Sequence, residues 1–284
     1  MGGKVAAATA RTSHRPRRTA GRGRQAHVLT TVVLLQKLVA RGSPKTLRER
    51  PAAMDIAGCP LPEDRLYDLE NDVWWAEDPG IGTARVGILG TLGAFAGPFR
   101  NFTFRPVEGA VDRGRSVATV ESARFTGAVR MPVDVVLVER NEAVARNPRL
   151  LNDAPYGDGW VVRVRPARPD DPGRLLDSAA SIASRLEERI RTQRIRCWPA
   201  TPEFELNEVG LECSAVLARL RESLMTVQPG ESVLLVTDDP TSPIELVRWS
   251  DQTGHSLLAS RKDDTLFQFL VRREADPKPR LRRG

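Results

Sequence analysis

The sequence predicts a mixed fold class, with an amino-terminal all-β domain and a smaller carboxyl-terminal α/β domain. Three observations lead to this prediction. The 284 residues are enough for two domains that each bury a core. Short strand-like runs, separated by turns rich in Gly, Pro and Asp, fill residues 66–166. From residue 203 onward, strand-like and helix-like runs alternate.

Residues 1–53 form a basic leader that holds 12 of the 43 Lys and Arg residues and one acidic residue, Glu49. The remainder therefore carries 31 basic against 35 acidic residues, a net charge of −4. A transit peptide or a basic arm would explain the leader, but its composition favours disorder or a start codon assigned too early, with translation beginning at Met54. Because the positive charge belongs to the leader, we expect no nucleic-acid surface on the folded part.

Five runs in the first domain predict strands: Arg85–Gly93, Asn101–Val107, Ser116–Ser122, Val133–Glu139 and Trp160–Pro166. Many short strands at this spacing are typical of an all-β sandwich or barrel. The run PDDPG at residues 169–173 ends the pattern.

A helix is predicted next, over residues 175–190. Its apolar positions recur at helical spacing and are Leu175, Ala179, Ile182, Leu186 and Ile190. This stripe is expected to pack on a neighbouring domain. Residues 191–202 then read as a linker that contains Cys197.

The second domain is predicted as β-α-β-α-β-β, with helices on one face of a small mixed sheet. Its strands are expected at 204–210, 232–239, 256–261 and 266–273, and its helices at 210–227 and 243–253. The first helix should face inward with Val216, Leu217, Leu220 and Leu224, and Gly254 should cap the second helix.

The three cysteines, Cys59, Cys197 and Cys213, are odd in number and far apart. This spacing argues against a disulfide framework and fits a reducing, cytoplasmic location. His255 is the only histidine after the leader and no Cys/His pair has ligand spacing, so no metal site is predicted. No run approaches the ~20 apolar residues of a membrane helix.

The first domain resembles the glycine cleavage system H protein in three long motifs: GCPLPEDRLYDLENDVWW, VATVES and NEAVARNPRLLNDAPYGDGWVVRVRP. The first of these is more similar to the H-like lipoate-binding proteins of bacterial sulfur oxidation. The resemblance covers residues 58–169. It implies a flattened β-sandwich, the barrel-sandwich hybrid of lipoyl domains, that presents one lysine on a hairpin tip for lipoyl attachment.

Aligning the VES motif places Arg124 at the position of that lysine. A guanidinium is always charged and cannot be acylated as an amine can. The sequence offers no lysine between Met54 and Lys262, so no covalent lipoyl cofactor is expected. Two interpretations of Arg124 remain open. It is either a cation that binds an acidic partner or the carboxylate of free lipoate, or a solvated surface arginine, which the preference of this chain for Arg favours.

Other polar residues of these motifs suggest structural roles. Glu121 and Asp158 invite an acid/base reading, but nothing in the sequence brings them together. Asn152, Pro155, Tyr156, Gly157 and Trp160 are predicted to form a tight turn closed by an aromatic ring.

The second domain resembles the TusA/SirA-type sulfur carriers over residues 204–273, in the motifs GLEC, PGE, DDP and TGH. That family carries sulfur as a persulfide on the cysteine of a Cys-Pro-x-Pro motif. The resemblance makes Cys213 the nucleophile and the transient site of a cysteine persulfide. Ser214 and Val216 stand where the two prolines would be.

The residues around Cys213 support the same role independently. A cysteine between a strand and a helix faces unpaired amides, which would lower its pKa. The alternative is a small buried cysteine that packs the helix start. Asp238, Asp239 and His255 are expected to serve turns and caps, with His255 a weaker candidate as proton donor. Cys59 and Cys197 could relay sulfur, although structural roles are favoured.

The sequence therefore predicts residues 54–169 as an H-like domain, 170–202 as helix and linker, 203–273 as a sulfur-carrier domain and 274–284 as a basic tail. The expected function is a sulfurtransferase-type carrier that passes sulfur through Cys213, with the H-like domain as a docking module. Sulfur-donor and sulfur-acceptor proteins, and lipoyl-dependent enzymes, are the expected partners, without nucleic acid or membrane. The alternatives are a glycine-cleavage H-protein homologue without its lipoyl lysine, or a non-catalytic adaptor.

Overall fold

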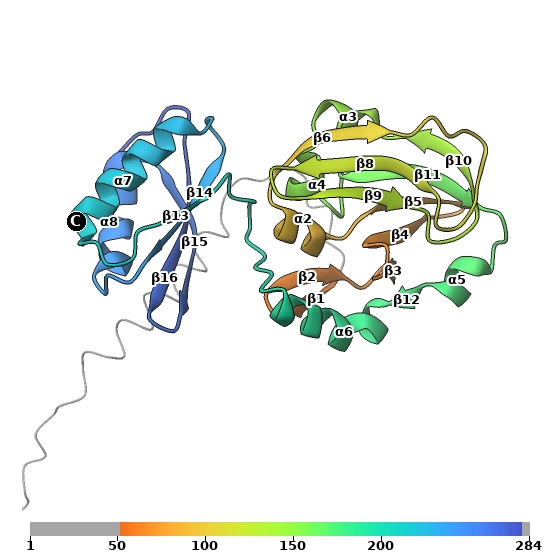
Figure 1. Cartoon of the computed structure of the whole chain (residues 1–284), viewed down its shortest axis with the longest axis horizontal. Coiled ribbons are helices and arrows are strands. Elements are labelled where there is room, and N and C mark those ends of the chain that lie inside the picture. The colour runs from red at the N-terminus through yellow and green to blue at the C-terminus, as the bar shows by residue number, and fades with distance from the viewer. Residues whose placement is uncertain (1–51, 280–284) are drawn as a thin grey trace, which may run out of the picture. The chain divides into compact units, whose positions relative to one another are not determined.

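The computed structural model describes residues 52–279, and its helices and strands are drawn in Figure 1. The predicted leader lies outside the described residues except for Ala52 and Ala53, as does the end of the predicted basic tail. Within residues 52–279, no helix has the length and apolar character needed to cross a bilayer.

The first domain is a β-sandwich, as predicted. Its seven-stranded sheet has the order β12-β3-β4-β5-β11-β10-β7, with bounds Asp177–Ser178, Leu66–Asp68, Val73–Asp78, Thr83–Ile88, Trp160–Pro166, Val135–Arg140 and Ala110–Val111. The facing three-stranded sheet has the order β6-β8-β9, with bounds Phe99–Phe104, Ser116–Ser122 and Thr126–Arg130. Apolar side chains of both sheets, such as Val86 and Val120, form one buried core between them.

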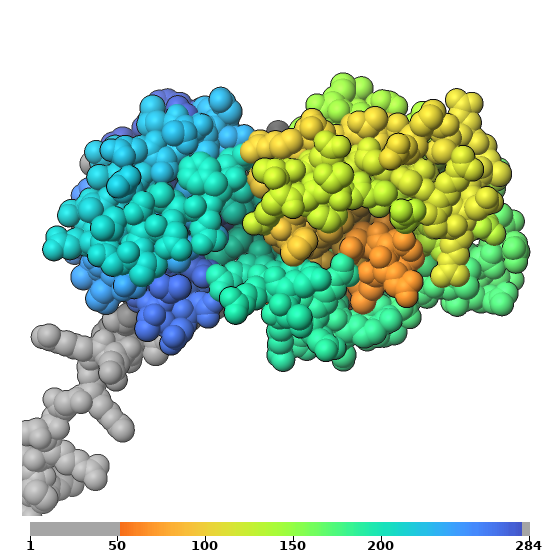
Figure 2. Space-filling view, in the orientation of Figure 1, coloured from red at the N-terminus to blue at the C-terminus, as the bar shows by residue number. Residues whose placement is uncertain are grey.

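Side chains alternate between the two faces of the larger sheet. Both faces carry apolar residues, and both are covered. Trp75 points into the sandwich core, whereas its neighbour Trp74 lies in a second apolar cluster on the opposite face. Both rings are about 1% exposed. The second cluster is closed by the hairpin of β1 (Ala53–Ile56) and β2 (Cys59–Pro62) and by helix α6 (Ala179–Thr192). In Figure 2 the orange surface of the early residues lies between α6 and the yellow-green strands β8 and β9.

The predicted helix over 175–190 forms, but it begins four residues later. The Ser178 hydroxyl accepts a hydrogen bond from the Ser181 amide at 3.2 Å and caps α6. Leu175 ends the short helix α5 (Asp171–Leu175) and is exposed, so its assignment to the apolar stripe is wrong. The other four positions of the stripe are buried against the first domain, as expected.

The predicted strand over 85–93 is wrong beyond Ile88, where helix α2 (Gly90–Ala96) begins. Two glycines of this helix allow close packing. A Cβ at Gly90 would lie 3.2 Å from the Tyr156 ring, and a Cβ at Gly93 would lie 3.2 Å from the Asn152 amide. Short helices α3 (Glu142–Arg146) and α4 (Leu150–Asp153) complete this side of the domain.

The second domain has the predicted β-α-β-α-β-β order. Its elements are β13 (Glu205–Asn207), α7 (Cys213–Thr226), β14 (Ser232–Thr237), α8 (Ser242–Thr253), β15 (Ser256–Asp263) and β16 (Leu266–Arg272). The sheet order is β13-β14-β16-β15, and only the β13–β14 pair is parallel. Both helices pack on one face, and Gly254 caps α8 with a φ of 78°. The linker residues Trp198 and Ala200 pack on the other face.

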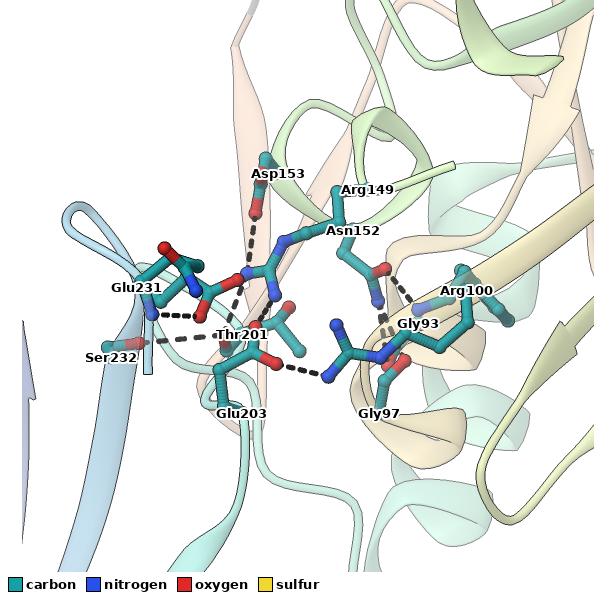
Figure 3. Close-up of polar contacts among 12 residues, drawn as sticks. Gly93, Gly97, Arg100, Arg149, Asn152, Asp153, Thr201, Glu203, Glu231 and Ser232 are labelled. Carbon is teal, nitrogen blue, oxygen red and sulfur yellow. Dashed lines mark hydrogen bonds and ion pairs between the residues drawn. The ribbon is translucent and has the colours of Figure 1, made fainter. Parts of the chain in front are cut away.

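The junction between the linker and the second domain, residues 201–203, contacts both domains. Glu203 donates its amide to the Ser232 carbonyl at 2.7 Å. Its buried carboxylate pairs with Arg149 and Arg100 of the first domain. Arg149 also donates to the Thr201 carbonyl at 3.2 Å. Figure 3 shows this carboxylate between the two guanidinium groups.

Cys59 and Cys197 form a disulfide, with Cα atoms 5.1 Å apart. The expectation that these cysteines form no disulfide is therefore wrong, and the inference of a reducing compartment loses its basis. The distance between the two cysteines along the sequence does not predict their pairing, because the linker returns to the β1–β2 hairpin after α6. The Cys197 carbonyl also accepts a hydrogen bond from Arg261, whose guanidinium lies over the Trp198 ring.

Thiol titration tests this pairing directly. Unfolded, unreduced protein should show one reactive thiol, that of Cys213, and reduced protein should show all three cysteines. Replacing Cys59 and Cys197 by serine should lower the free energy of unfolding by about 2–4 kcal/mol, because the disulfide closes a long loop. Urea denaturation measures this change, with Cys213→Ser as the control. Three reactive thiols without reductant would contradict the pairing.

Candidate functional site

The first candidate position, Arg124, lies on the exposed tip of the β8–β9 hairpin. The Ser122 amide donates to the Phe125 carbonyl at 2.8 Å and closes this tip. The Ser122 hydroxyl then donates to the Ala96 carbonyl at 2.7 Å, and Arg124 Nε donates to the same oxygen at 3.2 Å. Arg124 is therefore exposed but not simply solvated, because it satisfies a carbonyl at the end of α2.

Helix α2 is held under the hairpin tip by residues that the sequence analysis predicted to be structural. The Asn152 carbonyl oxygen accepts from the Phe99 amide at 2.9 Å, while its amide nitrogen donates to the carbonyls of Gly97 at 3.0 Å and Gly93 at 3.3 Å (Figure 3). The Tyr156 hydroxyl accepts from the Gly90 amide at 3.1 Å. Burial raises the pKa of Tyr156 to about 12, so the ring is neutral.

The residues at this tip do not fit a covalent lipoyl group. Attachment requires a primary amine, and the side chain presented here is a guanidinium whose Nε is already bonded to Ala96. Glu121, the neighbouring carboxylate, accepts a hydrogen bond from Asn101 across the sheet at 3.3 Å. Asp158 accepts a hydrogen bond at its backbone carbonyl from the Asn141 side-chain amide at 2.8 Å.

The second candidate position, Cys213, is the first residue of α7 and is half-buried. Helices α7 and α8 follow the parallel strands β13 and β14, so both begin at the same edge of the sheet. The loops before them are joined where the Gly210 amide donates to Asp238 Oδ1 at 2.7 Å. The topology therefore brings two helix starts together at Cys213.

Two hydroxyl groups from the start of α8 lie beside the Cys213 sulfur, those of Thr241 and Ser242. Thr241 is the residue before the helix, and Ser242 is its first residue. The Ser242 side chain is fully buried, and its hydroxyl has no hydrogen-bond partner within residues 52–279.

The Asp239 carboxylate accepts hydrogen bonds from backbone amides at these helix starts. It accepts from the Thr241 amide at 2.7 Å and from the Thr241 hydroxyl at 2.6 Å. It also accepts from the Cys213 amide. The Thr241 hydroxyl and these amides stabilise the charged form and lower the pKa of Asp239. Its expected role as a turn residue is confirmed.

The pKa of Cys213 is raised, mainly because burial disfavours the thiolate. The charges of Asp239 and Glu245 raise it further, while the hydroxyls of Thr241 and Ser242 oppose the shift. The expectation of a lowered pKa is therefore wrong. A carboxylate already bound to the helix-start amides offsets the positive end of the dipole.

His255 lies away from this sulfur. It follows the carboxyl end of α8, whereas Cys213 adjoins the amino end, and a 12-residue helix is about 18 Å long. Its Nδ1 accepts from the Glu274 amide at 3.2 Å, and its ring stacks on Trp249. Burial lowers its pKa. A role for His255 as proton donor to Cys213 is not supported by this placement.

Thr241 and Ser242 were not predicted as site residues from the sequence. A signal was present, because Thr-Ser-Pro after a strand is typical of a helix start. With the β-α-β-α order, that signal places the two residues at the same sheet edge as Cys213. In the part of the chain that the structure describes, no cluster of three or more metal-ligating side chains occurs.

Comparisons with known proteins identify both domains. The family model for the glycine cleavage H-protein matches residues 65–189, and that for sulfurtransferase TusA matches residues 204–273. The first match extends through α5 and most of α6, beyond the boundary at residue 169 drawn from the sequence.

Curated relatives match the first half of the chain. Glycine cleavage system H protein 5 of Aquifex aeolicus is 38% identical over 147 residues, covering 50% of this chain and 98% of that protein. Glycine cleavage system H protein 2 of the same organism is 34% identical, covering 50% and 88%. A crystal structure of an H protein from Mycobacterium marinum is 27% identical with a TM-score of 0.39, covering 44% of this chain and 98% of that chain.

The effect of the Asp239 charge on the pKa of the Cys213 thiol can be tested. Asp239→Asn keeps an acceptor oxygen for the Thr241 amide but removes the negative charge, so the pKa of Cys213 should fall and the thiolate fraction at pH 7 should rise about threefold to tenfold. The rate of alkylation as a function of pH measures this change. Asp238→Asn, whose carboxylate binds Gly210 instead, is the matched control. An unchanged or raised pKa in the Asp239 variant would contradict this electrostatic account.

Proposed function

The chain belongs to the glycine cleavage H-protein family and continues into a TusA domain, and from this premise we propose that it is a carrier of persulfide sulfur. Cys213 would hold the sulfur, and the H-like domain would dock, without a lipoyl group, on the proteins that supply or accept it. The observation that carries this proposal is the placement of a free cysteine at the start of α7, beside two hydroxyl groups.

The proposed step is thiol–persulfide exchange. The Cys213 thiolate attacks the terminal sulfur of a donor cysteine persulfide, a new S–S bond forms, and the donor S–S bond breaks. The donor leaves as a thiolate that carries the electron pair of the broken bond. An acceptor thiolate then attacks the terminal sulfur on Cys213, which leaves as a thiolate in turn. No external oxidant or reductant is required.

The raised pKa of Cys213 supports one alternative, a non-catalytic adaptor that keeps both carrier folds. A raised pKa means that less thiolate is present at neutral pH, which slows the proposed exchange. The glycine-cleavage carrier alternative is disfavoured by Arg124, because that reaction depends on a lipoyl-lysine.

Intact mass spectrometry with a persulfide donor tests the carrier proposal. The wild-type chain should gain one sulfur atom that maps to Cys213 and is lost on reduction, and Cys213→Ser should gain none. Reduction of the Cys59–Cys197 disulfide adds two hydrogens in both proteins and serves as an internal control. Wild-type protein that stays unmodified would support the adaptor, and a gain that survives in Cys213→Ser would remove this cysteine from the mechanism.

A lipoylation assay tests the prediction that no lipoyl group is attached at the hairpin tip. Wild-type protein should not be modified by a lipoate ligase with ATP and lipoate, because Arg124 cannot be acylated. Arg124→Lys should restore a primary amine on an otherwise intact hairpin, and mass spectrometry should then detect one lipoyl group. Arg130→Lys, on the neighbouring strand β9, is the matched control and should remain unmodified. Lipoylation of the wild-type chain would overturn this part of the proposal.

A further inference from the structure

The start of helix α8 buries a hydroxyl group, that of Ser242. The side chain is 0% exposed, yet its oxygen has no hydrogen-bond partner among the described residues. A buried hydroxyl without a partner is destabilising, so a ligand or a charged group that completes its hydrogen bond is expected here.

The Ser242 hydroxyl lies beside the sulfur of Cys213. Ser242 begins α8 and Cys213 begins α7, and the parallel β13–β14 pair brings these helix starts to one edge. The hydroxyl lies near enough to the sulfur to favour its anionic form. It has no hydrogen-bond partner within residues 52–279, so its hydrogen can turn toward an anion.

The neighbouring hydroxyl of Thr241 also lies beside the sulfur, but it is already hydrogen-bonded to a carboxylate. A hydroxyl has one hydrogen to donate, and that of Thr241 goes to Asp239 Oδ1 at 2.6 Å. The amides of Cys213 and Thr241 are bonded to the same carboxylate. Of the two hydroxyls beside the sulfur, only that of Ser242 lacks a hydrogen-bond partner within residues 52–279.

We infer that Ser242 is a positioning residue of the sulfur site, whose hydroxyl donates a hydrogen bond to the sulfur anion carried by Cys213, as thiolate or as persulfide. This inference rests on the proposed function and deepens it. A hydrogen bond to a charged sulfur gives the buried hydroxyl the partner that it otherwise lacks. It also opposes the two carboxylates, Asp239 and Glu245, that face the sulfur from the preceding turn and from α8.

The test is the pH dependence of Cys213 alkylation by iodoacetamide in the full chain, with the Cys59–Cys197 disulfide intact. Ser242→Ala should raise the thiol pKa by about one unit, so that alkylation at pH 7 slows about tenfold. The variant should fold, because it removes an unpaired buried hydroxyl. Ser242→Thr restores the hydroxyl and should return the profile toward that of the wild type.

Ser250→Ala is the matched control. Ser250 is also buried in α8, but its hydroxyl donates to the His255 carbonyl at 2.6 Å, at the other end of the helix. This variant should leave the thiol profile unchanged. A Ser242→Ala profile identical to that of the wild type, with the fold verified by circular dichroism, would overturn the inference.

A second measurement separates this inference from the proposed function. Each protein is incubated with a cysteine persulfide donor, and the sulfur gained at Cys213 is followed by mass. Slower gain in Ser242→Ala than in Ser250→Ala supports the inference for the persulfide state, and equal gain overturns it there. If wild-type protein gains no sulfur, the carrier proposal fails, and the alkylation profiles still decide the role of Ser242 toward the thiolate.

Discussion

Both candidate sites depend on one constraint, that the backbone groups at helix ends must find partners. In the first domain, the carbonyls at the end of α2 accept hydrogen bonds from Ser122, Arg124 and Asn152. In the second domain, the amides at the starts of α7 and α8 donate to Asp239. A helix end attracts a cation at its carbonyls and an anion at its amides. The two domains thus present an arginine and a carboxylate, each matched to the helix end that it closes.

This constraint also explains how α7 begins without the two prolines of the family motif. The residue before the helix, Glu212, makes no side-chain cap, and Ser214 and Val216 leave the backbone free to vary. The fixed start comes from the neighbouring turn instead, where Asp239 accepts from the Cys213 amide and Asp238 accepts from the Gly210 amide. The electrostatic consequence is unfavourable for a thiolate, because the carboxylate that fixes the helix also repels the sulfur anion.

The sequence allowed the domain order and the types of most elements to be predicted, because they depend on local periodicity. Strands β8 and β11 and the cap at Gly254 follow from such patterns. Helix α2 could not be predicted in this way, since its packing depends on Tyr156 and Asn152, which come about 60 residues later. The Cys59–Cys197 disulfide and the burial of the Ser242 hydroxyl could not be predicted for the same reason. Both depend on tertiary contacts that the spacing of residues in the sequence does not reveal.

The disulfide bears on the chemistry proposed for Cys213. A persulfide can lose its sulfur when a second thiolate attacks the inner sulfur, forms a disulfide and expels hydrosulfide. A chain with three free cysteines would carry two such thiolates on itself. Pairing Cys59 with Cys197 consumes both thiols, so that Cys213 is left as the single free cysteine of residues 52–279. In the proposed carrier, sulfur bound to Cys213 would then leave by attack from a partner, and the electrostatic surroundings of the thiol, with Asp239 beside it, would control how readily it is loaded.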